Sequence, residues 1–270
     1  MEEVPSSVQP IAGVGTSTAG FIGEADDVVM PMQPGQFERN SAGDVIKDSL
    51  GNVTPIPFDL ADPGVPQLIT SWESFKNHFG DFQDGNRILA HAVYGFFNNG
   101  GTRCWVTRVD GALSVENVRP ALAAFAGIDE IALVAVPGAT DSLIHAEVIA
   151  HCENVGDRFG ILDAPEVDEY VADDIQDDTP NSTYAALYYP RIEVFDPVDN
   201  ARAFVPPSGH ICGIFARIDT ERGVHKAPAN ATVRGALGVT QMITKADQEV
   251  LNPAGVNCLR MFVRDGVLLW

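Results

Sequence analysis

Basic residues are scarce in this sequence. Its 270 residues include 17 Lys and Arg against 37 Asp and Glu, which gives a net charge of −20 at pH 7. A nucleic-acid-binding protein needs a basic face that neutralises phosphates, so the sequence argues against a nucleic-acid partner. The scarcity is uneven, because residues 1–200 contain nine basic and 32 acidic residues, whereas residues 201–270 contain eight and five. This difference favours self-complementary association of acidic and basic regions.

Long apolar runs are also missing. No run approaches the roughly 18 residues that a membrane-spanning helix needs. The opening MEEVPSSVQPI is acidic and lacks the basic-then-apolar order of a secretory signal. We therefore expect the protein to be made and folded in the cytosol, without a direct membrane partner. The 45% hydrophobic content, with 25 Gly and 18 Pro, is typical of a loop-rich globular protein.

Cysteines are few and far apart. The four cysteines are separated by roughly 46 to 60 residues, and no C-x-x-C pair occurs. In a chain of this length without a secretory signal, that spacing predicts small buried hydrophobic side chains and no disulfide or zinc framework. The four are Cys104, Cys152, Cys212 and Cys258.

Nucleotide-binding motifs are incomplete. A Walker loop needs G-x-x-x-x-G-K-[ST], and no lysine occurs before Lys47. Gly13 and Gly15 form half of a dinucleotide fingerprint, and they precede a predicted strand instead of following it. Residues 11–25 therefore predict a tight turn that leads into a buried strand at 19–22, and no cofactor site.

Two other patterns raise the question of metal binding. His145 and His151 are six residues apart on one predicted helix, so they fall on different faces, and we expect a solvated helix surface and no metal site. Residues 166–178 contain seven acidic residues in thirteen. A calcium loop needs an internal glycine, which this segment lacks, so a solvated loop is predicted there.

Apolar periodicity predicts an α/β core. The runs at 131–136 and 159–162 are continuous, as in strands covered on both faces, and a helix between them completes a parallel βαβ unit. A short helix capped by Ser71 and Gly80 has Trp72, Phe75 and Phe79 on one face. The other predicted elements are helices at 86–97, 208–223 (N-cap Ser208, C-cap Gly223) and 244–255, strands at 66–70, 104–109 and 184–190, and a hairpin around Asp265–Gly266.

Residues 26–66 differ in character from the rest of the chain. They are bracketed by Pro- and Gly-containing stretches, and residues 50–53 have the composition of a hairpin turn. We expect a small, peripheral β-rich insertion. The predicted organisation is an N-terminal arm with the first core strand at 1–25, this insertion at 26–66, and an α/β core domain at 67–270.

In order along the chain, several segments resemble one known family. They are EEVPSSVQPIAGVGTSTAGFIG, LITSWESF, FFNNGGTRCWVTRV, ALVAVPG, DRFGILDAP, YAALYYP, PPSGHICGIFARIDTERGVHKAPAN and ITKADQEVLNPAGVNCLRMF. Together they are similar to the contractile tail sheath proteins of bacteriophages and related injection systems. The resemblance covers nearly the whole chain. Members of that family usually continue well past the strand that ends at Trp270, into a region that carries much of the inner-tube contact and a C-terminal arm. The resemblance therefore implies either a chain cut short at Trp270 or a divergent short member.

The resemblance implies a structural subunit with a subtilisin-like core domain. Copies would form hexameric rings stacked helically around an inner tube, with baseplate and terminator proteins as further partners and no cofactor. The assembly would contract to drive the tube through a target envelope, as part of a virion tail or a phage-like injection particle. Extended arms would link adjacent subunits by adding strands to a neighbour's sheet. In this sequence the arm residues would be Glu2, Glu3, Val4, Pro5 and Val8.

A subtilisin-like core raises the possibility of a peptidase. A Ser-His-Asp arrangement needs an activated serine with an oxyanion hole. No G-x-S-x-G elbow occurs, and the stretch Ser208–His210 sits at a predicted helix start. We therefore expect no catalytic residues. The alternatives to a sheath subunit are an α/β hydrolase-like enzyme and a monomeric binding module.

The stretch DTERGVHKAPANATVRGALGV, residues 219–239, places basic side chains among small residues in an otherwise acidic chain. A histidine beside a lysine in such a loop suits a phosphate site, a catalytic site or a scaffold loop. The resemblance favours a scaffold or interface loop that follows an amphipathic helix. Arg222, His225 and Lys226 would then cap carbonyls, pack, and meet acidic groups within or between subunits.

Overall fold

The main body of the protein is built on one mixed sheet. The computed structural model describes residues 17–167, 175–176 and 178–270. Among these residues the sheet has nine strands in the order β11-β14-β13-β8-β7-β6-β1-β5-β4. The strands are β1 (Ala19–Gly23), β4 (Gln67–Ile69), β5 (Cys104–Arg108), β6 (Leu133–Ala135), β7 (Phe159–Asp163), β8 (Ala185–Tyr189), β11 (Ala231–Thr232), β13 (Val256–Phe262) and β14 (Gly266–Leu269).

The six central strands of this sheet run parallel. β5, β1, β6, β7, β8 and β13 pair in parallel, whereas β4, β14 and β11 are antiparallel to their neighbours. The predicted βαβ unit is confirmed, because β6 and β7 pair in parallel with Leu133 opposite Phe159. Helix α4 (Ser142–Val155) connects them. The continuous apolar runs of the sequence are therefore strands of a parallel sheet.

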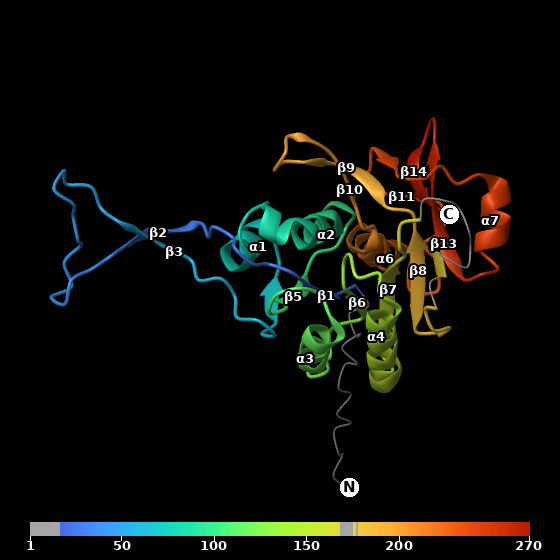
Figure 1. Cartoon of the computed structure of the whole chain (residues 1–270), viewed down its shortest axis with the longest axis horizontal. Helices are drawn as coiled ribbons and strands as arrows, with labels where there is room; N and C mark the ends of the chain where they lie inside the picture. Colours follow the sequence, from blue (N-terminus) through green and yellow to red (C-terminus); the bar gives the residue numbers. More distant parts are fainter. Residues whose placement is uncertain (1–16, 168–174, 177) are drawn as a thin grey trace, which may run out of the picture.

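Helices cover both faces of the sheet, as Figure 1 shows. One core cluster joins the sheet to α1, α2 and α6, and a second joins it to α3, α4 and α7. Neighbouring strand residues point into opposite clusters, for example Phe21 into the first and Ile22 into the second. Burial on both faces explains why these strands lack polar alternation. The helices are α1 (Trp72–Phe79), α2 (Arg87–Asn98), α3 (Val115–Phe125), α6 (Ser208–Arg222) and α7 (Lys245–Leu251), with a 3-10 turn η1 (Asp84–Asn86) before α2.

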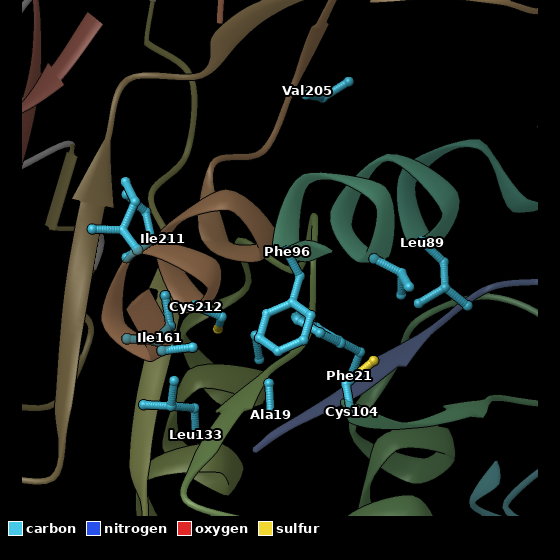
Figure 2. Packing of buried hydrophobic residues seen from close by; sticks show 14 of the residues in the cluster. Ala19, Phe21, Leu89, Phe96, Cys104, Leu133, Ile161, Val205, Ile211 and Cys212 are labelled. Atoms are coloured by element: carbon cyan, nitrogen blue, oxygen red, sulfur yellow. The ribbon is translucent and has the colours of Figure 1, made fainter. Parts of the chain in front are cut away.

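Close packing of α2 against α6 organises the first cluster. Figure 2 shows Phe96 of α2 pointing toward Phe21 of β1, with Cys212 of α6 beside them, and the two phenyl rings meet edge to face at 5.5 Å. The helices approach closely at Gly209, where an added Cβ would lie 2.3 Å from the Cα of Ala92. Only glycine fits there, so the small residues of α6 set the distance between the helices.

Several local predictions are confirmed. Ser71 caps α1 by accepting a hydrogen bond from the Ser74 N–H, and Gly80 ends the helix. Thr244 caps α7 in the same way, and β13 and β14 form the predicted hairpin. The prediction of Ser208 as the N-cap of α6 is wrong. Pro207 occupies that position, and Ser208 is the first helical residue with a buried side chain.

Residues 32–57 form a two-stranded projection, which we call the β2–β3 ribbon. Strands β2 (Met32–Phe37) and β3 (Pro55–Pro57) pair only with each other among the described residues. In Figure 1 the ribbon extends well away from the helices and the main sheet. The turn predicted at 50–53 is present, because the Asp48 N–H donates to Asn52 O over 2.9 Å and the Asp48 carboxylate accepts from the Leu50 and Asn52 N–H groups.

A second small sheet lies over the end of α2 and was not predicted. It has the order β10-β9-β12, from β9 (Ile192–Asp196), β10 (Ala201–Val205) and β12 (Gly238–Val239). Val194 of β9 shares the first core cluster with Val93 of α2, and Arg87 at the start of α2 pairs with buried Asp196 over 2.9 Å. In the described part of the chain, no helix is long and apolar enough to cross a membrane.

Candidate interaction surface

The predicted loop residues lie at the end of α6. The helix ends at Arg222, and Gly223 follows with φ +85° while its N–H donates to Asp219 O over 3.0 Å. A tight turn then brings the Lys226 N–H to Gly223 O over 3.1 Å. We call residues 222–228 the basic loop. The side chains of Arg222, His225 and Lys226 are all exposed on it.

The basic loop begins a stretch without acidic residues. No Asp or Glu occurs from residue 222 through residue 246, although the chain has 37 of them. Among the described residues, none of the ion pairs involves Arg222, His225 or Lys226. Within the subunit, these three side chains therefore face solvent.

A cleft lies beneath the basic loop. Its volume is about 530 Å³, and it opens between the loop, the last turns of α6 and the first residues of β6 and β7. We call it the amino-end cleft, since Leu133 and Phe159 begin their strands there. Phe159 and Phe215 stack with ring centroids 6.0 Å apart, and Val224 on the loop is 65% exposed. Other lining residues are Ala132, Gly156, Asp157, Arg158, Thr183, Tyr184, Ile218, Asp219, Lys226, Ala227 and Pro228.

The described chain enters the fold beside this cleft. The carbonyl of Thr18 accepts hydrogen bonds from the N–H groups of Ala132 (2.9 Å) and Leu133 (3.2 Å), and both of these residues line the cleft. The predicted arm residues Glu2, Glu3, Val4, Pro5 and Val8 lie outside the described residues. Sequence reasoning missed the cleft, because its lining comes from segments more than 90 residues apart that share no local motif.

The stretch Ser208–His210 has the residue types of a catalytic site, but its geometry is that of a buried structural network. The Ser208 hydroxyl donates to Asp163 Oδ2 over 2.6 Å, and its N–H donates to Oδ1 over 2.9 Å. Burial raises the pKa of Asp163 to about 6, against the lowering effect of its hydrogen bonds from Ser208 and Gly138. Ser208 is fully buried. Such a hydroxyl fastens a helix to a strand and presents no nucleophile to a substrate.

His210 does not join Ser208. Its ring packs against the backbone of Gly95 on α2, where an added Cβ would lie 2.3 Å from the imidazole. Burial, followed by the nearby His91, lowers the pKa of His210 to about 3. The imidazole is therefore neutral at physiological pH and serves the packing of α2 on α6.

The prediction of a solvated surface for His145 and His151 is wrong. Both side chains are buried, with His145 1% exposed. His145 Nδ1 lies 2.8 Å from Thr179 Oγ1 and its Nε2 lies 3.0 Å from Ala139 O. His151 Nε2 lies 3.2 Å from the Arg158 guanidinium, and burial together with that cation lowers the pKa of His151 to about 4. Polar partners that lie outside α4 allow both histidines to be buried.

The four cysteines are free and buried, as predicted for small hydrophobic side chains. Burial raises the pKa of Cys152 to about 12 and that of Cys258 to about 11. Burial also raises the pKa values of Cys104 and Cys212. All four thiols are therefore protonated and poorly reactive in the native protein.

The candidate site of this protein is an interaction surface. It consists of the exposed basic loop and the cleft beneath it, whereas the Ser208 network is buried. Comparison with known proteins identifies the family. The model of the phage tail sheath protein central domain matches residues 111–270, more than half of the chain. The chain therefore belongs to the phage tail sheath protein family, whose members are structural proteins and not enzymes.

A curated relative and several solved structures agree with this family. The tail sheath protein of Burkholderia phage BcepMu is 23% identical over 204 residues, which cover 70% of this chain and 40% of that protein. The contracted helical sheath of the anti-feeding prophage is similar with a TM-score of 0.70 and 24% identity, over 100% of this chain and 65% of that one. The contracted PVC sheath complex of an extracellular contractile injection system gives 0.69 and 24%, over 100% and 64%.

A bacterial protein shares the fold at lower identity. The sheath tail protein of Desulfitobacterium hafniense is similar with a TM-score of 0.56 and 10% identity, over 98% of this chain and 74% of that one. The chain thus spans 40% of the length of its curated phage relative and just under two thirds of the two injection-system sheath chains. The homologues and structural neighbours are sheath proteins of phage tails and contractile injection systems.

Proposed function

We propose that this chain is the structural subunit of a contractile sheath, in a virion tail or a phage-like injection particle. One observation carries the proposal: the whole described fold matches the subunits of two contracted sheaths, while residues 111–270 match the family's central domain. Copies polymerise as stacked hexameric rings around an inner tube protein. Baseplate and terminator proteins bound the two ends of this polymer.

The sheath mechanism needs rigid subunits that can change partners. The large sheet buried between helices provides a rigid body, because close-packed protein interiors resist continuous deformation. We infer that this body, residues 67–270, is the subtilisin-like core domain of the family. On contraction the bodies move from a metastable packing to a more compact one, and the free energy stored at assembly drives the tube through a target envelope.

Residues 1–66 lie outside this core domain and have peripheral roles. Residues 1–25 supply the first core strand and an N-terminal arm, in which Glu2 to Val8 add a strand to a neighbour's sheet. Residues 26–66 form an outer insertion that faces away from the tube axis. The reach of the β2–β3 ribbon beyond the core supports this placement.

The basic loop contributes to contacts between subunits. Arg222, His225 and Lys226 are exposed, have no ion-pair partner among the described residues, and belong to a molecule of net charge −20. Acidic surfaces of neighbouring copies are therefore suitable partners, and such charge pairs steer association and fix register. The loop is an interface element and has no catalytic role.

Sedimentation tests the proposal against a monomeric binding module. The complete natural gene product is expressed with its tube protein, and the lysate is centrifuged at high speed. A sheath subunit pellets as a large polymer that contains both proteins. A protein that elutes as a monomer under all conditions with its tube protein present would contradict the proposal.

A further inference from the structure

The amino-end cleft is the feature of the surface whose occupant can be inferred. Its walls combine stacked Phe159 and Phe215 with Val224, an apolar side chain left 65% exposed on the rim. Contiguous apolar surface of this kind on a folded protein commonly marks a contact site. Lys226 on the loop also lines it, together with Asp157 and Asp219. The guanidinium of the lining residue Arg158 is buried and donates to the carbonyls of Phe125 and Ile128.

The described chain begins at the mouth of the cleft. The Thr18 carbonyl accepts hydrogen bonds from the N–H groups of Ala132 and Leu133, and both residues line the cleft. Val14 is three residues from Ser17 and Ile11 is six, which allows reaches of about 10 and 20 Å for an extended chain. Both side chains are therefore within reach of the cleft without any change in the described fold.

The chemistry of this segment suits the cleft. Residues 11–16, IAGVGT, contain two branched apolar side chains, no charge and two glycines. The glycines allow the backbone to bend into a confined site. Farther toward the N-terminus, Glu2 and Glu3 are the only charged side chains among residues 1–16, and their sign is opposite to that of the basic loop.

We propose that the amino-end cleft is the docking site of residues 11–16 of the same chain. Ile11 and Val14 cover Phe159, Phe215 and Val224, and the docked segment fixes the direction in which residues 1–10 leave the subunit. Only this last consequence rests on the proposed function, since it concerns where the arm reaches a neighbour. The docking itself is a property of the single subunit.

Occupation by the same chain is favoured over occupation by a second copy. A segment tethered three to six residues away has an effective concentration of the order of millimolar or higher. A second copy would have to exceed that concentration in free solution to compete. The cleft is consequently filled before assembly begins, and the arm is aimed when subunits meet.

Limited proteolysis of the single subunit tests the docking. Trypsin cleaves after Lys226, at the rim of the cleft, and after Arg264, an exposed residue in the β13–β14 turn. The test variant is Ile11→Asp with Val14→Asp, and the matched control is Val4→Asp with Val8→Asp, which makes the same change outside residues 11–16. We expect cleavage after Lys226 to be about fivefold faster or more in the test variant. Cleavage after Arg264 reports on the fold and should be equal in all three proteins.

Three outcomes of this experiment would overturn the proposal. Equal Lys226 cleavage in the wild type and the test variant shows that the segment does not cover the cleft. Equal acceleration in the control variant shows that the effect is not specific to residues 11–16. Protection of Lys226 that disappears on dilution shows that a second copy is the occupant.

A crosslink provides a readout that does not depend on a destabilised variant. In Val14→Cys with Val224→Cys, mild oxidation should give an intramolecular disulfide in a monomer, since the four natural cysteines are buried. Val4→Cys with Val224→Cys is the control and should crosslink much more slowly. Equal crosslinking of the two pairs, or a crosslinked dimer, contradicts docking within one chain. Because both experiments use the isolated subunit, their result stands whether or not the protein polymerises.

Discussion

Ser208 donates its hydroxyl and its backbone N–H to the same carboxylate, that of Asp163, over 2.6 and 2.9 Å. The Gly138 N–H donates to this carboxylate as well, over 3.0 Å. Asp163 ends β7, Ser208 begins α6 and Gly138 follows β6, so one buried side chain joins three elements at the carboxyl end of the parallel strands. A catalytic triad would leave the serine hydroxyl accessible to substrate. Here the hydroxyl is buried and hydrogen-bonded to Asp163.

Removal of this carboxylate should destabilise the protein strongly. Asp163→Ala leaves the N–H and the hydroxyl of Ser208 buried without partners, and the Gly138 N–H partly buried without one. Each unsatisfied buried donor costs roughly 1–3 kcal/mol. We expect a loss of at least about 3 kcal/mol in the free energy of unfolding, measured by urea titration. Asp163→Asn, which retains an acceptor oxygen, should lose less. Asp265→Ala in an exposed turn is the control, and an equal loss there would contradict the structural role of Asp163.

Acid should destabilise the fold through buried histidines. Burial keeps His210 neutral by lowering its pKa to about 3, below the ordinary value of 6.5. The unfolded chain therefore binds a proton between these two pH values that the folded chain does not, and stability is lost as pH falls below 6.5. For His210 this amounts to about 2 kcal/mol at pH 5 relative to pH 8. Asp163 has a raised pKa and acts in the opposite direction between about pH 6 and its ordinary value of 3.8.

The measurement is the urea midpoint from pH 8 to pH 5 for three proteins. The wild type should lose stability as the pH falls, and His210→Gln should lose less stability over the same range. His225→Gln changes an exposed histidine and should follow the wild type. A His210→Gln profile parallel to that of the wild type would refute the assignment of the pH dependence to this residue.

Charge reversal on the basic loop should weaken assembly and leave folding unchanged. Arg222→Glu with Lys226→Glu replaces two exposed cations by anions on a protein that is already acidic, and like charges repel neighbouring copies. We expect the concentration needed for polymerisation, measured by sedimentation at low salt, to rise severalfold. Lys245→Glu reverses an exposed cation that pairs within its own helix with Glu249, and it serves as the control. Equal effects of the two changes on polymerisation would show that the basic loop is not part of the interface between subunits.

The β2–β3 ribbon should be dispensable for assembly. The Phe58 N–H donates to Pro31 O over 2.9 Å, so the two ends of residues 32–57 are already close together. A short Gly-Ser linker in their place should preserve the thermal midpoint and the yield of polymer. The cut must spare Ala61, which is buried and accepts a hydrogen bond from Arg108 over 2.6 Å. Loss of polymer from a folded deletion variant would show that the ribbon takes part in subunit contacts.

The sequence predicted those parts of the fold whose signal is local. The β6–α4–β7 unit follows from two continuous apolar runs, and the limits of α1 follow from Ser71 and Gly80. Strand β9 was missed because its buried Asp196 depends on Arg87, more than 100 residues earlier in the chain. His145 was misplaced for the same reason, since Thr179 is its partner.

The candidate surface was predictable only in part. Arg222, His225 and Lys226 stand out in an acidic chain, and the structure places all three on one exposed loop. The cleft beneath that loop has no counterpart in the sequence pattern. Phe159 and Phe215 are separated by 56 positions and meet only because α6 packs across the start of β7. The sequence pattern therefore identifies the basic loop, whereas the amino-end cleft arises only from the tertiary fold.

Electron microscopy of the complete natural gene product, expressed with its tube protein, tests the central claim most directly. The account predicts hollow cylinders with six subunits per ring, in a long, narrow form and a shorter, wider form. Acid or mild denaturant should convert the long form to the short one without unfolding the subunits, because the long form is metastable. Dispersed single particles, or cylinders of one fixed length and diameter under all of these conditions, would contradict a contractile sheath.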